Sequence, residues 1–150
     1  MQQARGSPEA LPLLLTLSSG VKGFTTIHAG SARQALTRLR FVCQLADTRS
    51  ELPVSALNTL VSESIDVVVH CVRGPSGPSV SSIVAVEDLT GPSDATQFTV
   101  TEVFARAEPA APLEWTGQIP SRLGRRLAEH GHEIRSLLGA ERATRREARR

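Results

Sequence analysis

Aromatic side chains are scarce in this chain of 150 residues, at 3%, with four Phe, one Trp and no Tyr. Proteins that bind single-stranded nucleic acid stack bases on aromatic rings, so the composition does not favour that class. Long apolar runs are also missing, because Pro12 and Thr16 interrupt residues 11–17 well short of the ~18 apolar residues of a membrane span. The N-terminus lacks the basic start and apolar stretch of a signal peptide. We therefore expect a cytoplasmic protein.

Metal-binding patterns are absent as well. Cys43 and Cys71 stand alone without a CxxC pair, which predicts two buried thiols rather than a metal site or a disulfide. His130 and His132 are two positions apart, and such side chains point to different sides of a helix. We expect no metal site.

Lysine occurs once, at position 22, and this excludes a phosphate-binding loop within the chain. A Walker A loop needs Lys between Gly and Ser or Thr, whereas Lys22 lies between Val21 and Gly23. Arginine supplies the other cations of a chain with formal net charge +2. Five of them crowd the end, where a solvated tail is favoured over binding to nucleic acid or anionic lipid: Arg142, Arg145, Arg146, Arg149 and Arg150.

Turn and capping residues divide the first half into a helix, a strand and two more helices. Ser7 and Pro8 predict a helix over residues 8–19, and Gly20 and Gly23 stop it before a strand over residues 24–28. Ser31 caps a second helix with one apolar face, and Pro53 opens a third that runs to about residue 64. The second helix is expected to expose Arg33, Gln34, Thr37, Arg38, Arg40 and Gln44.

The second half reads as strands followed by a helix. Residues 65–72 form a nearly continuous apolar run, typical of a strand buried on both faces, and residues 80–86 are its hairpin partner. Another strand is expected near residues 97–106. A helix over residues 120–138 follows, interrupted by two glycines.

His28 is the best candidate for chemistry, because it ends a predicted strand just before a helix. Ligands of open α/β sheets collect at this position, and an imidazole there can donate to a phosphate oxygen. Ser31 and the first amides of the next helix would add anion-binding capacity. A structural histidine is the alternative.

The segment Gly23-Phe24-Thr25-Thr26-Ile27-His28-Ala29, with residues 5–20 before it and 30–36 after it, resembles the CpaF-type (Flp pilus assembly) ATPases of the type II/type IV secretion superfamily. Residues 64–70 and 101–104 are similar to the closing strands of that family. The resemblance covers about residues 3–106. It implies an α/β fold, namely a partial P-loop (RecA-like) ATPase domain without its N-terminal strands, with a terminal β-hairpin region and a C-terminal helix.

The same resemblance implies cytoplasmic hexamers that use ATP and Mg²⁺ at the inner face of the cytoplasmic membrane, where inner-membrane secretion or pilus platform proteins are the partners. His28 and Arg5 would be the catalytic residues, and Thr26, Ser31 and Arg33 would bind nucleotide. Gln3 and Gly30 depart from the family, which has glutamate and usually asparagine there.

Two hypotheses follow. The first is the C-terminal portion of a secretion or pilus-assembly ATPase, inactive alone because the Walker A loop and the Walker B acid are missing. The second is a non-catalytic interaction module derived from the same fold. We expect residues 1–106 to form the ATPase part, 107–118 a linker, and 119–150 a helix and basic tail.

Overall fold

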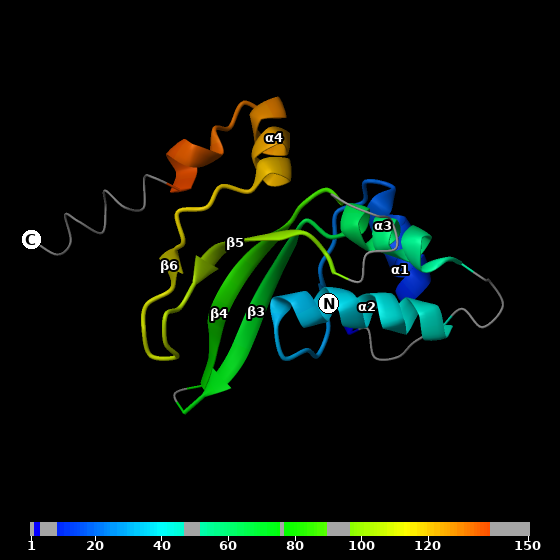
Figure 1. Ribbon diagram of the computed structural model, residues 1–150, viewed down its shortest axis with the longest axis horizontal. Helices are drawn as coiled ribbons and strands as arrows, with labels where there is room; N and C mark the ends of the chain where they lie inside the picture. Colours follow the sequence, from blue (N-terminus) through cyan, green and yellow to red (C-terminus); the bar gives the residue numbers. More distant parts are fainter. Residues whose placement is uncertain (1, 4–8, 47–51, 76, 90–96, 139–150) are drawn as a thin grey trace, which may run out of the picture.

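A computed structural model of the chain describes residues 2–3, 9–46, 52–75, 77–89 and 97–138. Figure 1 shows α1, α2 and α3 gathered beside one end of an antiparallel sheet, with α4 set apart from them. The elements follow in the order β1 (Gln2–Gln3), α1 (Ala10–Ser18), β2 (Thr25–Thr26), α2 (Ala32–Ala46), α3 (Val54–Ser64), β3 (Val67–Gly74), β4 (Gly77–Val86), β5 (Val100–Ala105), β6 (Glu114–Trp115) and α4 (Ser121–Glu129).

The N-terminal unit is a β-α-β crossover. β1 and β2 pair in parallel, with Gln2 opposite Thr25 and Gln3 opposite Thr26, and α1 connects them. Gly20 has a φ of +95°, which a side chain would disfavour, and the predicted helix stop is confirmed there. The strand expected over residues 24–28 is shorter, with two residues.

α2 begins as the sequence predicts. The Ser31 hydroxyl accepts a hydrogen bond from the Gln34 amide at 3.2 Å, which satisfies a donor of the first helical turn. The apolar faces of three helices then meet the ends of the sheet in a single core: Ala10, Leu14, Leu36, Leu39, Val42, Cys43, Leu57, Val61, Val86 and Phe98.

Arg40 was expected on the wet face of α2, and this prediction is wrong. The side chain is only 6% exposed, and its guanidinium donates to Asn58 Oδ1 on α3 at 2.9 Å. Its position along the helix, one residue after the buried Leu39, turns it toward α3. A long arginine side chain can cross apolar surface when its head group finds an acceptor.

The second sheet has the order β3-β4-β5-β6 and is antiparallel throughout. The predicted hairpin is confirmed, with Val67 opposite Ala85. The prediction that β3 is buried on both faces is wrong. β3 is the outer strand of the sheet, and it leaves Val67, Val69 and Val72 partly exposed. A continuous apolar run is typical of parallel strands, but it also suits an outer strand with one face on a core.

The C-terminal region differs from the predicted linker and helix. Within residues 107–118 the short strand β6 pairs with β5, with Trp115 opposite Phe104. The helix expected over residues 120–138 breaks at Gly131, whose φ is +80°, and helix resumes only at residues 134–138. In the described ranges, no helix has the length and apolar character to cross a membrane.

Candidate functional site

The junction between β2 and α2 carries three of the predicted site residues. Thr26 ends β2, His28 follows with an exposed side chain, and Ser31 caps α2. The imidazole of His28 has no hydrogen-bond partner in the part of the chain that the structure describes. The ring is thus exposed in the loop that leads into α2, and the N-terminal end of a helix favours an anionic ligand. Arg5 lies outside the described residues.

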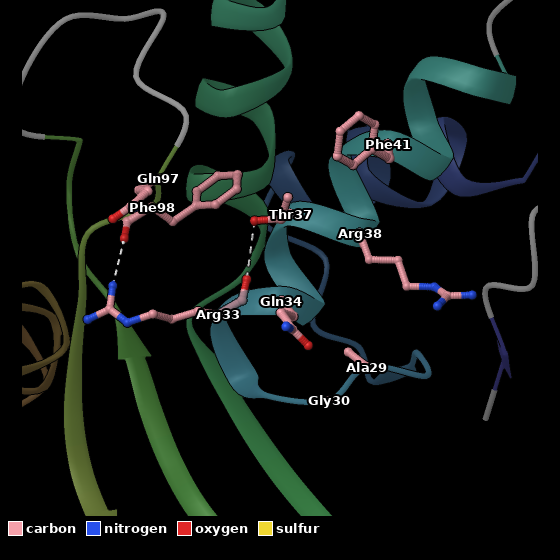
Figure 2. A pocket seen from close by; sticks show the side chains of 9 residues that line it. All are labelled: Ala29, Gly30, Arg33, Gln34, Thr37, Arg38, Phe41, Gln97 and Phe98. Carbon is pink, nitrogen blue, oxygen red and sulfur yellow. Dashed lines mark hydrogen bonds between the residues drawn. The ribbon is translucent and has the colours of Figure 1, made fainter.

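Arg33 leaves this junction and reaches toward the chain that leads into β5. Its Nη1 donates to the carbonyl oxygen of Phe98 at 3.3 Å. Figure 2 shows the side chain directed to Gln97 and Phe98. The structure therefore brings Arg33 to a groove beside α2 that His28 does not line.

That groove has a volume of about 480 Å³ and runs over the exposed face of α2. Thr26, His28 and Ser31 do not line it. Its walls are Ala29, Gly30, Arg33, Gln34, Thr37, Arg38, Phe41, Gln97 and Phe98. Arg33 and Arg38 point to opposite sides of the helix (Figure 2), so they do not converge on one small anion.

A second polar cluster, which the sequence did not reveal, fixes α4 to the sheet. Glu87, directly after β4, is 9% exposed, and one of its carboxylate oxygens accepts from the Thr101 hydroxyl at 2.7 Å and from the Ser121 amide at 3.0 Å. The other oxygen accepts from the Arg122 amide at 2.9 Å. The Ser62 hydroxyl donates to the Glu87 carbonyl at 3.1 Å. The carboxylate thus caps α4 from another element.

The side chain of Arg122 completes this cluster at the end of α3. It donates to the carbonyl of Ser62 and, at 3.0 Å, to Asp66, which also pairs with Arg126. Asp88 lies 4.0 Å from Nε of Arg122. With these partners the guanidinium is satisfied by the protein itself, so we assign it a structural role.

The pKa of Asp88 is lowered, chiefly by the hydrogen bond that Arg125 donates at 2.9 Å. A hollow of about 340 Å³ lies between α3 and α4, and Arg122 and Asp88 are among its walls. Both of these charges already have partners within the protein, so neither is left unpaired for a ligand. No local pattern signals this cluster, since its acids and arginines are far apart in sequence.

A histidine and a serine also meet on the sheet, outside the predicted site. Nδ1 of His70 lies 2.7 Å from Oγ of Ser81, at the point where the register of β3 and β4 shifts. The Ser81 hydroxyl lies 3.3 Å from the His70 carbonyl, to which it donates. Among the described residues no carboxylate orients the ring, and no three His, Cys, Asp or Glu side chains gather as metal ligands would.

No protein family model matches the sequence. Over 70 residues the chain is 40% identical to the type IV secretion system protein PtlH of Bordetella pertussis, and equally to the PtlH homologs of Bordetella parapertussis and Bordetella bronchiseptica. The aligned stretch makes up 46% of this chain, and the chain spans only 20% of the length of these relatives. The similarity supports a relationship with a type IV secretion-system family.

Proposed function

We propose that the chain is the C-terminal part of a secretion or pilus-assembly ATPase, which couples ATP hydrolysis to protein export or pilus assembly. The observation that carries the proposal is the run from the parallel strand β2 through His28 to the capped start of α2. Nucleotides bind outside the carboxyl ends of such strands. The similarity to a type IV secretion system protein favours the same class.

In this role His28 contacts the terminal phosphate of ATP, because its ring is exposed and has no partner among the described residues. Thr26 and Ser31 shape the loop around it. Arg33 donates to the carbonyl oxygen of Phe98, so it contacts a nucleotide only if the nucleotide lies on the side of α2 that carries the groove. Arg5 acts from the segment before α1.

The residues present do not form a complete site for ATP and Mg²⁺. From Thr25 to Arg33 there is neither a lysine to neutralise phosphates nor a carboxylate to organise a metal ion. Hydrolysis therefore requires a second polypeptide segment that carries the phosphate-binding loop. By the resemblance, the working assembly is a hexamer next to inner-membrane platform proteins.

A non-catalytic interaction module is the second candidate. The specific observation in its favour is the cluster around Glu87 and Arg122, which docks α4 firmly on a fold that lacks a phosphate-binding loop. Such a module would keep the architecture and bind a partner through its surface.

Co-expression separates the two candidates. DNA immediately upstream of the coding sequence is read for a GxxxxGK[ST] segment, and any such product is co-expressed with the chain for assays of ATP-dependent phosphate release. We expect release from the pair and none from the chain alone. Substituting His28→Ala should lower the rate by about 10²-fold or more, as loss of a transition-state donor does. His132→Ala, at another exposed histidine, is the control.

The ATPase proposal fails if the His28→Ala pair is as active as the parent pair, or if no phosphate-binding segment is encoded upstream. Tight ATP binding by the chain alone would contradict the inference from the single lysine.

A further inference from the structure

The exposed face of α2 has the composition of a helix-binding surface. We propose that the α2 groove binds an acidic amphipathic helix of a partner protein. The groove is lined on the helix itself by Arg33, Gln34, Thr37, Arg38 and Phe41. This inference goes beyond the proposed ATPase role and does not depend on nucleotide binding.

Apolar side chains continue the groove toward the end of α2. Phe41 is 52% exposed and Leu45 is 76% exposed. Gln34, Arg38, Phe41 and Leu45 follow at spacings of four, three and four, which places them along one side of a helix. At 1.5 Å per residue the line is about 16 Å long, close to three turns of a docked helix. Small ligands do not need a surface of this length.

The ring of Phe41 is held by the fold. The Arg40 guanidinium lies 5.3 Å from the centroid of the Phe41 ring, and the same group lies 6.0 Å from the Phe98 ring. Arg40 is itself buried and fixed by its hydrogen bond to Asn58. A ring positioned before binding loses little side-chain entropy when a partner covers it.

The charge of the groove selects the partner. Among the residues that the structure describes, its lining contains two arginines and no acidic residue. Arg38 makes no ion pair within the described ranges, and Arg33 donates only to the neutral carbonyl of Phe98. Carboxylates on a partner complement such a surface and raise its association rate. Because the arginines point to the two sides of α2 (Figure 2), a helix lying along α2 can present one carboxylate to each.

The test uses the full chain and a displayed library of 14-residue helical peptides. Each peptide has a fixed Leu seam, and the positions beside the seam are randomised between Glu and Lys. We expect selection to enrich Glu, and the enriched peptide to bind in a fluorescence anisotropy titration at least tenfold more tightly than its Glu→Lys version. Higher salt should weaken it.

Matched variants locate the binding surface. Arg38→Glu and Phe41→Ala should each weaken the enriched peptide at least tenfold, whereas Arg73→Glu and Val69→Ala, at an exposed arginine and an equally exposed valine on β3, should not. Since Arg38 is exposed, its charge reversal leaves the core intact, and far-UV circular dichroism checks each variant. The double variant Arg33→Glu/Arg38→Glu should reverse the preference to Lys peptides.

Several outcomes would overturn the proposal. Selection of Lys-rich or charge-neutral peptides would do so, as would peptides whose binding is insensitive to Arg38 and Phe41. Dimerisation of the free chain that Phe41→Ala or Leu45→Ala abolishes would assign the face to a second copy instead. Protection of the groove by ATP, with no effect of the peptides, would assign it to nucleotide.

Discussion

The carboxylate of Glu87 accepts a hydrogen bond at 2.9 Å from the backbone amide of Arg122, and this contact joins the end of β4 to the start of α4. Pro120, the residue before the helix, provides no side-chain cap. A helix leaves its first amides unpaired, and an anionic acceptor at this end is favourable. Glu87 therefore serves α4 as a cap supplied by a residue more than thirty positions away.

Glu87→Gln should destabilise the protein by about 1–2 kcal/mol, because an amide group replaces one of two oxygens that accept helix amides. Urea unfolding measures the change. Glu102→Gln, at an exposed glutamate of β5, is the matched control and should unfold close to the parent. Equal midpoints for the two variants would show that Glu87 does not support α4.

Arg122→Ala should cost more, about 3 kcal/mol, because it removes a side chain that is only 8% exposed and that donates to the Ser62 carbonyl and to Asp66. Asp66 would then keep only its pair with Arg126. Arg125→Ala is the comparison on the same helix, where the arginine pairs with Asp88 on an exposed surface. That exposed pair should contribute little. Thermal unfolding measures the loss of stability in both variants. A larger loss for Arg125→Ala than for Arg122→Ala would refute the structural role assigned to Arg122.

The local features of the fold were predictable from the sequence, while those that join distant segments were not. Ser31 as a cap and Gly20 as a stop depend on a few adjacent residues, and both predictions are confirmed. Arg40 was misplaced because its acceptor, Asn58, belongs to another helix. The contact between Glu87 and Arg122 likewise depends on how the sheet meets α4, which no local pattern encodes.

The candidate site divides in the same way. The strand, the histidine and the helix start were predictable because they form one contiguous segment. In the structure Thr26 ends β2, His28 follows it, and Ser31 caps α2. The direction of Arg33 was not predictable, because the acceptor that holds it is the carbonyl of Phe98.

The two thiols should react at very different rates. Cys43 is fully buried in the helical core, as predicted, but Cys71 is exposed, so the prediction of two buried thiols is wrong for Cys71. Ellman's reagent at pH 8 should therefore modify one thiol quickly and the second only as the protein unfolds. Cys71→Ser should remove the fast phase alone. Rapid reaction of both thiols in the folded protein would contradict the packing of α2 against α1 and α3.

Cys43 also predicts a loss of stability at alkaline pH. Burial raises its pKa to about 11, whereas an unfolded chain ionises its thiols near ~8.5. Above that lower value the unfolded state has released a proton that the folded state keeps, so stability falls as pH rises toward 11, by up to about 1.4 kcal/mol per pH unit. Urea unfolding from pH 7 to 10 measures the slope, and Cys43→Ala should flatten it. An unchanged slope would exclude this origin.

Gly131→Ala should destabilise the turn after α4 by about 1–2 kcal/mol, because alanine disfavours a φ of +80°. His132→Ala, at the adjacent exposed position, is the control. Circular dichroism supplies a second readout. If Gly131→Ala raised the helix content without loss of stability, α4 would be continuous with residues 134–138, and the fold would not require the turn at Gly131.

The bond between Arg122 and the Ser62 carbonyl spans sixty residues, which has a consequence for how the chain folds during synthesis. Every element that α4 docks on is synthesised before α4. A contact between distant residues also has to overcome the entropic cost of closing the loop between them. The helices and the hairpin can therefore assemble while the ribosome is still at work. α4 can dock on them only after it has been synthesised in its turn.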